Sequence, residues 1–99
     1  MLTRQYYVYL LANAPFGVLY LGVTSDLRRR IWEHKTDAVE GFSKRYSVHM
    51  LVWYEVHEDI TAAIQREKQI KKWKREYKLN LIAAMNPEWK DFYPEIQSF

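Results

Sequence analysis

Residues 5–12 read Gln-Tyr-Tyr-Val-Tyr-Leu-Leu-Ala, a run of aromatic and aliphatic side chains near the start of the chain. This composition favours a β-strand, in which alternate side chains point to opposite faces. Residues 13–17 follow with turn chemistry, including a proline and a glycine, and residues 18–23 predict a second strand. The two strands therefore predict an antiparallel hairpin with Tyr7 and Tyr9 on one face.

The rest of the chain predicts helices and one more strand. Residues 24–26 (Thr-Ser-Asp) supply N-cap candidates for a helix that runs to about Thr36. Residues 50–56 predict a third strand beside the hairpin, and residues 60–76 and 79–85 predict two helices. The order β-β-α-β-α-α predicts an α+β fold, a small three-stranded antiparallel sheet flanked by helices.

Length and composition narrow the class of protein. Ninety-nine residues fit one domain over 1–99, and an apolar content of 48% can form a core. The longest apolar run, residues 6–12, is far shorter than the roughly 20 residues that span a bilayer. The chain has no cysteine, which excludes disulfides and thiolate metal sites. We therefore expect a cytoplasmic protein without a membrane anchor.

The positive charge is unevenly distributed, although the net charge is only +3. Any one basic cluster is typical of a solvated helix face, but three clusters together indicate a polyanionic partner such as a phosphate backbone. The clusters consist of Arg28, Arg29, Arg30 and Lys35; Lys44 and Arg45; and Arg66, Lys68, Lys71, Lys72, Lys74, Arg75 and Lys78.

Glu67 is the most diagnostic single residue. Ile60, Ala63 and Ile64 define an inward stripe on the predicted long helix, and Glu67 falls in the middle of that stripe. A lone buried charge is costly, so the carboxylate needs a partner. The structural alternative is an ion pair with Lys71, or a slight rotation of the helix that lets the Glu67 carboxylate reach solvent. The functional alternative is a hard cation such as Mg²⁺, whose other ligands are water and phosphate oxygens.

Arg30 and His34 lie four residues apart on one face of the first predicted helix. A guanidinium suits a scissile phosphate, and an imidazole can take or relay a proton near neutral pH. Taken singly, Arg30 is explained as one member of a solvated arginine run, and His34 as a histidine at a helix end. Tyr9 and Tyr20 are ordinarily strand aromatics, and a phenol is a poor base unless nearby cations lower its pKa.

The joint pattern resembles the signature of the GIY-YIG nuclease superfamily. Residues 19–30 and 66–73 resemble its small single-domain bacterial branch, which is similar to the N-terminal domain of the C component of excinuclease ABC. The resemblance covers about residues 5–92 and leaves a C-terminal tail, 93–99. Two positions depart from the pattern, because Tyr7 replaces the glycine of the first motif and Leu21 the isoleucine of the second. The residues that carry the resemblance are Tyr7-Val8-Tyr9, Tyr20-Leu21-Gly22, Arg30, His34 and Glu67.

The resemblance implies phosphodiester hydrolysis that depends on one cation, Mg²⁺ or Mn²⁺. Glu67 would then ligate the metal, and Arg30 would stabilise the charge that develops on the phosphate. Tyr9 or Tyr20 would help to activate the attacking water together with His34, and the choice between the two tyrosines stays open. The asparagine of the family would be Asn80 or Asn86, with Asn80 favoured by its distance from Glu67. Residues expected to bind nucleic acid are Arg28, Lys35, Lys44, Arg45, Lys71, Lys74 and Asn80.

The sequence thus favours a DNA endonuclease directed by DNA structure rather than by base sequence, in repair or recombination. A partner protein that supplies specificity is compatible with this interpretation. The main alternative is a non-catalytic nucleic-acid-binding module that retains the fold. A third is an interaction domain whose basic helix meets an acidic protein.

Overall fold

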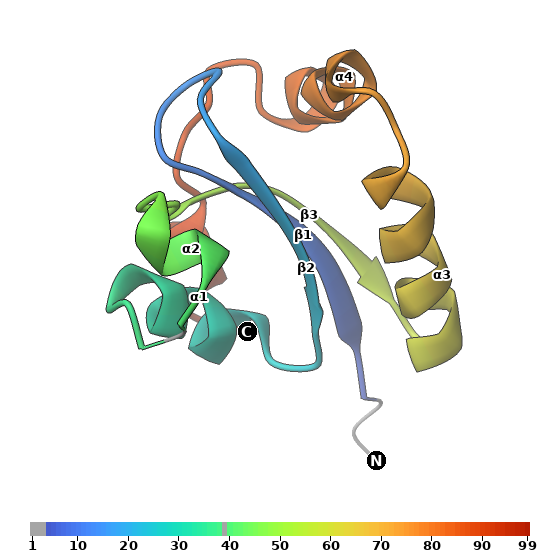
Figure 1. Cartoon of the computed structure of the whole chain (residues 1–99). Helices are drawn as coiled ribbons and strands as arrows, with labels where there is room; N and C mark the ends of the chain where they lie inside the picture. Colours follow the sequence, from blue (N-terminus) through green and yellow to red (C-terminus); the bar gives the residue numbers. More distant parts are fainter. Residues whose placement is uncertain (1–3, 39) are drawn as a thin grey trace.

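The predicted order of strands and helices is confirmed by the structure, a computed structural model that describes residues 4–38 and 40–99 (Figure 1). In the described part of the chain no helix is long and apolar enough to cross a membrane. The elements are β1 (Tyr6–Ala12), β2 (Leu19–Thr24), α1 (Leu27–Lys35), α2 (Phe42–Arg45), β3 (Met50–His57), α3 (Ile60–Lys71), α4 (Arg75–Met85) and the 3₁₀-helix η1 (Tyr93–Ile96).

The three strands form one antiparallel sheet with β1 in the middle, in the order β2-β1-β3. Tyr9 lies opposite Gly22 on β2 and opposite Tyr54 on β3. Because β1 is paired along both edges and covered on both faces, residues 7–12 are all buried. This position explains why the first strand is apolar throughout rather than alternating with polar residues.

Helices cover both faces of the sheet, so the molecule has three layers. Figure 1 shows α3 and α4 on one side of the strands and α1 with α2 on the other. Val8 and Leu10 pack with residues of α3 and α4, whereas Tyr9 and Leu11 pack with α1 and η1. The predicted alternation of side chains along the first strand is therefore confirmed.

The structure corrects the boundary between the last two helices. The predicted helix over 60–76 ends at Lys71, and the next begins at Arg75 rather than at residue 79. The amide of Trp73 donates to the carbonyl of Ile70, which tightens the end of α3 into a turn. The turn redirects the chain so that Ile70 and Ile82 both join the core on the same face of the sheet. The short helix α2 lies where the sequence predicted only a polar loop.

Candidate active site

A cleft of about 570 Å³ lies along β2, the edge strand of the sheet. Its walls come from β1, β2 and the four α-helices. Four of the five candidate catalytic side chains line it, and His34 lies behind Tyr9. The lining residues are Tyr9, Leu19, Tyr20, Leu21, Gly22, Val23, Arg30, Phe42, Glu67, Lys71 and Lys78.

Tyr9 and His34 form a buried hydrogen-bonded pair at the back of the cleft. The hydroxyl oxygen of Tyr9 lies 3.0 Å from Nε2 of His34. Only 2% of Tyr9 and 1% of His34 is exposed. The Tyr20 ring packs 5.1 Å from the imidazole, but its hydroxyl has no hydrogen-bond partner among the residues that the structure describes. The two tyrosines therefore differ, since only Tyr9 is joined to an imidazole by a hydrogen bond.

Burial keeps both members of this pair uncharged at neutral pH. Loss of hydration, helped by the guanidinium of Arg30, lowers the pKa of His34 from 6.5 to about 4. Glu33 opposes this shift and His49 adds to it. Burial also raises the pKa of Tyr9 above the ordinary value of 10.0. A neutral imidazole with its proton on Nδ1 can accept a hydrogen bond from the tyrosine hydroxyl at Nε2.

The buried imidazole should make the stability of the fold depend on pH. Below pH 6.5 the unfolded chain binds a proton on residue 34 that the folded chain does not bind until about pH 4. The free energy of unfolding should therefore fall as the pH drops through this window, by about 3 kcal/mol from this residue. Urea unfolding of the wild type and of His34→Gln at a series of pH values measures the effect. Equal pH dependence in the two proteins would show that residue 34 is not responsible.

Gly22 leaves the space that the Tyr9 ring occupies. A β-carbon at position 22 would lie 2.4 Å from both Cζ and the hydroxyl oxygen of Tyr9. The two residues are paired across β1 and β2, so neither backbone can move without disturbing the sheet. The glycine is thus required for close approach, and it lets the Tyr9 phenol reach the cleft through the edge strand.

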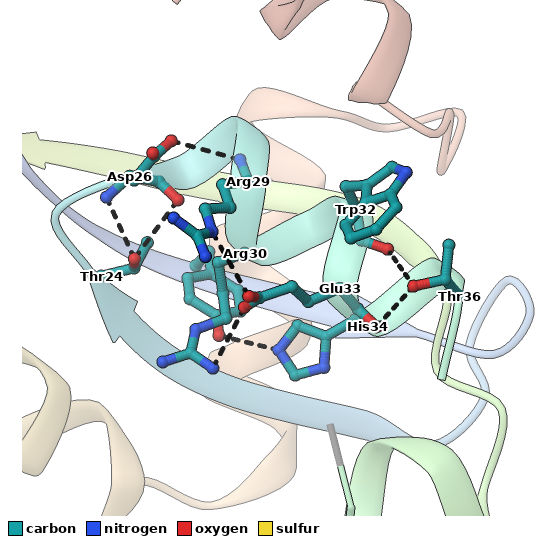
Figure 2. Close-up of polar contacts among 9 residues, drawn as sticks. Thr24, Asp26, Arg29, Arg30, Trp32, Glu33, His34 and Thr36 are labelled. Carbon is teal, nitrogen blue, oxygen red and sulfur yellow. Dashed lines mark hydrogen bonds and ion pairs between the residues drawn. The ribbon is translucent and has the colours of Figure 1, made fainter. Parts of the chain in front are cut away.

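Arg30 is placed by the start of α1. Asp26 caps this helix by accepting a hydrogen bond from the backbone amide of Arg29. Nη1 of Arg30 lies 3.5 Å from Oε1 of Glu33, and 41% of the arginine side chain is exposed. Figure 2 shows Arg29 and Arg30 directed toward Glu33 on the same helix. Such a partly exposed pair is weak, so the guanidinium remains available to an anion in the cleft.

Glu67 is half-buried on the side of α3 that faces the cleft. The predicted inward stripe is only partly right, because Ala63 is buried whereas Ile60 and Ile64 are 48% and 37% exposed. The two isoleucines lie at the rim of the sheet and line a separate, smaller hollow. Within residues 4–38 and 40–99, Glu67 has neither an ion pair nor a hydrogen bond. The ion pair with Lys71 that the sequence allowed is not formed.

The chemistry of Glu67 fits a hard divalent cation. Mg²⁺ is commonly bound in proteins through one or two carboxylates, with water and substrate phosphates as the other ligands. The described residues contain no group of three or more histidine, aspartate or glutamate side chains that could enclose a metal. The available donor set is therefore one carboxylate at the wall of an open cleft.

Of the residues expected to bind nucleic acid, only Lys71 lines the cleft. Lys78 lines it too, and the sequence had placed this residue only in a basic cluster. Lys71 and Lys78 lie seven residues apart, a spacing that would share a face of one helix, but the turn between α3 and α4 separates them, so helical spacing does not explain their common position. Phe42 also lines the cleft, with its ring 6.0 Å from that of Tyr20. The unpredicted helix α2 presents Phe42, and no spacing pattern in so short a segment identifies it.

Four of the expected contacts have partners within the protein. The guanidinium of Arg28 donates to the carbonyl of Gln97. Lys35 donates to the carbonyl of His49 and to Asp91, so its ammonium holds α1 to the residue before β3 and to the C-terminal segment.

The other two of these four lie in α2. Lys44 pairs with Glu40 at 3.0 Å, and the Arg45 guanidinium lies 5.7 Å from the centre of the Tyr46 ring. Lys74, at the N-cap of α4, is exposed.

The two candidate asparagines have different environments. Asn86 is buried, and its side-chain amide donates to the carbonyls of Val52 and Lys90. These bonds fasten the end of α4 to β3, which is a structural role. Asn80 is exposed and lines a hollow on α4 outside the cleft.

Comparison with known proteins places this chain in a family. The model of the GIY-YIG catalytic domain matches residues 5–80. The chain belongs to the GIY-YIG family. This GIY-YIG domain is 34% identical to a UPF0213 protein of Streptococcus pyogenes serotype M5, over 92% of this chain and 99% of that protein. It is 37% identical to a UPF0213 protein of Natronomonas pharaonis, over 83% of this chain and 95% of that protein.

A solved structure supports the fold of this GIY-YIG domain. The solution NMR structure of a UPF0213 protein from Bacillus halodurans matches with a TM-score of 0.56 and 24% sequence identity. The match covers 88% of this chain and 92% of that one. The predicted membership of the small single-domain GIY-YIG branch, a nuclease-type family, is thereby confirmed.

Proposed function

We propose that this GIY-YIG domain is a metal-dependent endonuclease that hydrolyses DNA phosphodiester bonds. The observation that supports this most is the unpaired, half-buried carboxylate of Glu67 in a cleft that also contains Arg30 and Lys71. A carboxylate held partly out of water without a partner costs free energy that an ion pair would remove. Its retention at the wall of a basic cleft is explained if Glu67 binds Mg²⁺ or Mn²⁺ there.

The hydrogen bond between Tyr9 and His34 supplies a proton path. The phenol of Tyr9 lines the cleft, whereas the imidazole lies behind it. As the attacking water loses a proton to the Tyr9 oxygen, the hydroxyl proton of Tyr9 can pass to Nε2 of His34. This exchange avoids a free phenolate, which the raised pKa of Tyr9 disfavours, and it forms a transient imidazolium on His34, whose lowered pKa returns the proton readily. We therefore assign the role of base to Tyr9 and leave Tyr20 to pack beside the substrate.

Arg30 and the lysines would hold the phosphate. The forked donors of Arg30 suit the oxygens of the scissile phosphate and stabilise the charge that grows on them. Lys71 and Lys78, on the opposite wall, would position the flanking backbone. A bound divalent cation would polarise the phosphate and neutralise the leaving oxygen.

The substrate would be recognised by shape rather than by base sequence. Lysine and arginine at the cleft are suited to phosphates, which carry no sequence information. Distorted, branched or nicked DNA is therefore the expected substrate, in repair or recombination.

Cleavage assays with and without metal test this proposal. Supercoiled plasmid and branched DNA should be cut in Mg²⁺ or Mn²⁺ and left intact in EDTA. The Tyr9→Phe protein, purified in parallel, should cut about 100-fold more slowly because it keeps the ring but lacks the hydroxyl. Tyr20→Phe is the matched control and should cut much faster than Tyr9→Phe. Wild-type protein that binds DNA but cuts nothing with any metal would instead establish a non-catalytic binding module.

A further inference from the structure

A second hollow with an aromatic wall lies on α4, outside the cleft. It measures about 490 Å³ and is lined by Trp73, Tyr77, Asn80, Leu81 and Ala84. The last four residues follow helical spacing and so form one face of α4. Tyr77 is 52% exposed, so its ring is accessible to a ligand in this hollow.

Trp73 separates this hollow from a neighbouring one. The neighbour, of about 500 Å³, is lined by Trp73 together with Lys68 and Lys72 from the end of α3 and two glutamines. The Arg66 guanidinium lies 5.2 Å from the centre of the Trp73 ring, and Arg66 is itself paired with Glu55 at 3.0 Å. The tryptophan is therefore held in place before any ligand arrives.

The charges around these hollows favour an anionic ligand with flat apolar parts. Among the described residues no acidic side chain lines either hollow, whereas Lys68 and Lys72 line one of them. Exposed Lys74 follows Trp73 directly in the chain. A second copy of the protein docked through the same face would bring these lysines together and be repelled. A nucleic-acid strand instead presents phosphates to the lysines and bases to the aromatic rings.

We propose that the hollow of Trp73 and Tyr77 binds an unpaired base of a nucleic-acid strand whose adjoining backbone enters the cleft. Lys78 lines the cleft and Tyr77, its neighbour in the chain, lines the hollow, so both sites border α4. The exposed Asn80 amide can donate to and accept from the edge of the base. The inference rests on the proposed nuclease function and narrows its substrate to DNA with a single-stranded segment beside the scissile bond.

Binding measured in EDTA tests the site without requiring cleavage. The probes are fluorescently labelled oligothymidylate and a blunt duplex of mixed sequence, read by anisotropy. Tyr77→Ala should weaken binding of the single strand roughly 10-fold and leave duplex binding unchanged, since one stacked base contributes on this scale. Tyr77→Leu, which keeps apolar bulk on the helix, should weaken it as well. Trp32→Ala is the matched control because Trp32 is an aromatic residue of similar exposure, 53%, on α1.

Three results would overturn the inference. The first is unchanged single-strand binding in both Tyr77 variants, and the second is an equal loss on single strand and duplex. The third is a wild-type dimer that Tyr77→Ala converts to monomer in light scattering, which would make the hollow a self-association surface. Failure of the wild type to cut DNA would count against the nuclease function alone, because every binding measurement is made without metal.

Discussion

Replacing Gly22 with alanine is expected to lower the free energy of unfolding by about 3 kcal/mol, through overpacking and a broken hydrogen bond. The new β-carbon would lie 2.4 Å from two atoms of the Tyr9 side chain. Tyr9 is buried and bonded to His34, so its ring can move only by giving up that bond. At an unconstrained strand position alanine is favoured over glycine by roughly 0.5–1 kcal/mol. A loss of stability in Gly22→Ala would therefore be opposite in sign to the change expected without the Tyr9 contact.

A double-mutant cycle with Tyr9 isolates this effect. In a Tyr9→Leu background the ring and hydroxyl are absent, and Gly22→Ala should then cost little or be stabilising. Urea unfolding of the four proteins gives the coupling between the two positions. The same cost in both backgrounds would mean that position 22 is constrained by something other than the Tyr9 ring. Gly22→Ala should also lose cleavage activity, because the displaced phenol leaves the cleft wall.

Replacing Glu67 with glutamine is expected to abolish cleavage without harming the fold. The loss in rate should be at least about 100-fold, corresponding to about 3 kcal/mol of transition-state stabilisation that a metal ligand supports. The side chain has no ion pair among the described residues, so a neutral isostere should leave the free energy of unfolding unchanged or slightly higher. DNA binding in EDTA should become slightly tighter, because the substitution removes a negative charge from the cleft in which the phosphate would bind.

Single-turnover cleavage, anisotropy and urea unfolding measure these three effects on one variant. Glu88→Gln is the matched control, since Glu88 is exposed and does not line the cleft. Mn²⁺ should raise the melting temperature of the wild type more than that of Glu67→Gln. Cleavage at the wild-type rate in Glu67→Gln would remove Glu67 from the site.

Much of the fold could be predicted from local patterns. The hairpin and third strand followed from aromatic and aliphatic runs, and the N-cap Asp26 is one of the three candidates in residues 24–26. The break between α3 and α4 could not be predicted, because residues 72–74 contain neither glycine nor proline. There the helix ends for a tertiary reason, since Ile70 and Ile82 must both reach the sheet. Local propensity carries no information of that kind.

The residues of the candidate site could be predicted from the sequence, but the contacts between them could not. The resemblance to the GIY-YIG signature brought Tyr9, His34 and Glu67 into one expected site. Only the packing of α1 against the sheet shows that Tyr9 bonds to His34, and only the strand register shows that Tyr9 lies against Gly22. Lys35 was expected at the nucleic acid, but it reaches Asp91, which lies 56 residues further along the chain. Contacts over such separations depend on the complete fold.

The position of β1 at the middle of the sheet has a consequence for protein synthesis. This strand leaves the ribosome before the other two, but its partner β3 is made more than forty residues later. The core on the Tyr9 face also needs Ile96, which follows every other helix and strand of the domain. One edge of β1 therefore stays unpaired until β3 is made, and its Tyr9 face stays incompletely covered until almost all of the domain has been translated. A nascent chain of this kind is a natural client for chaperones that bind at the ribosome exit.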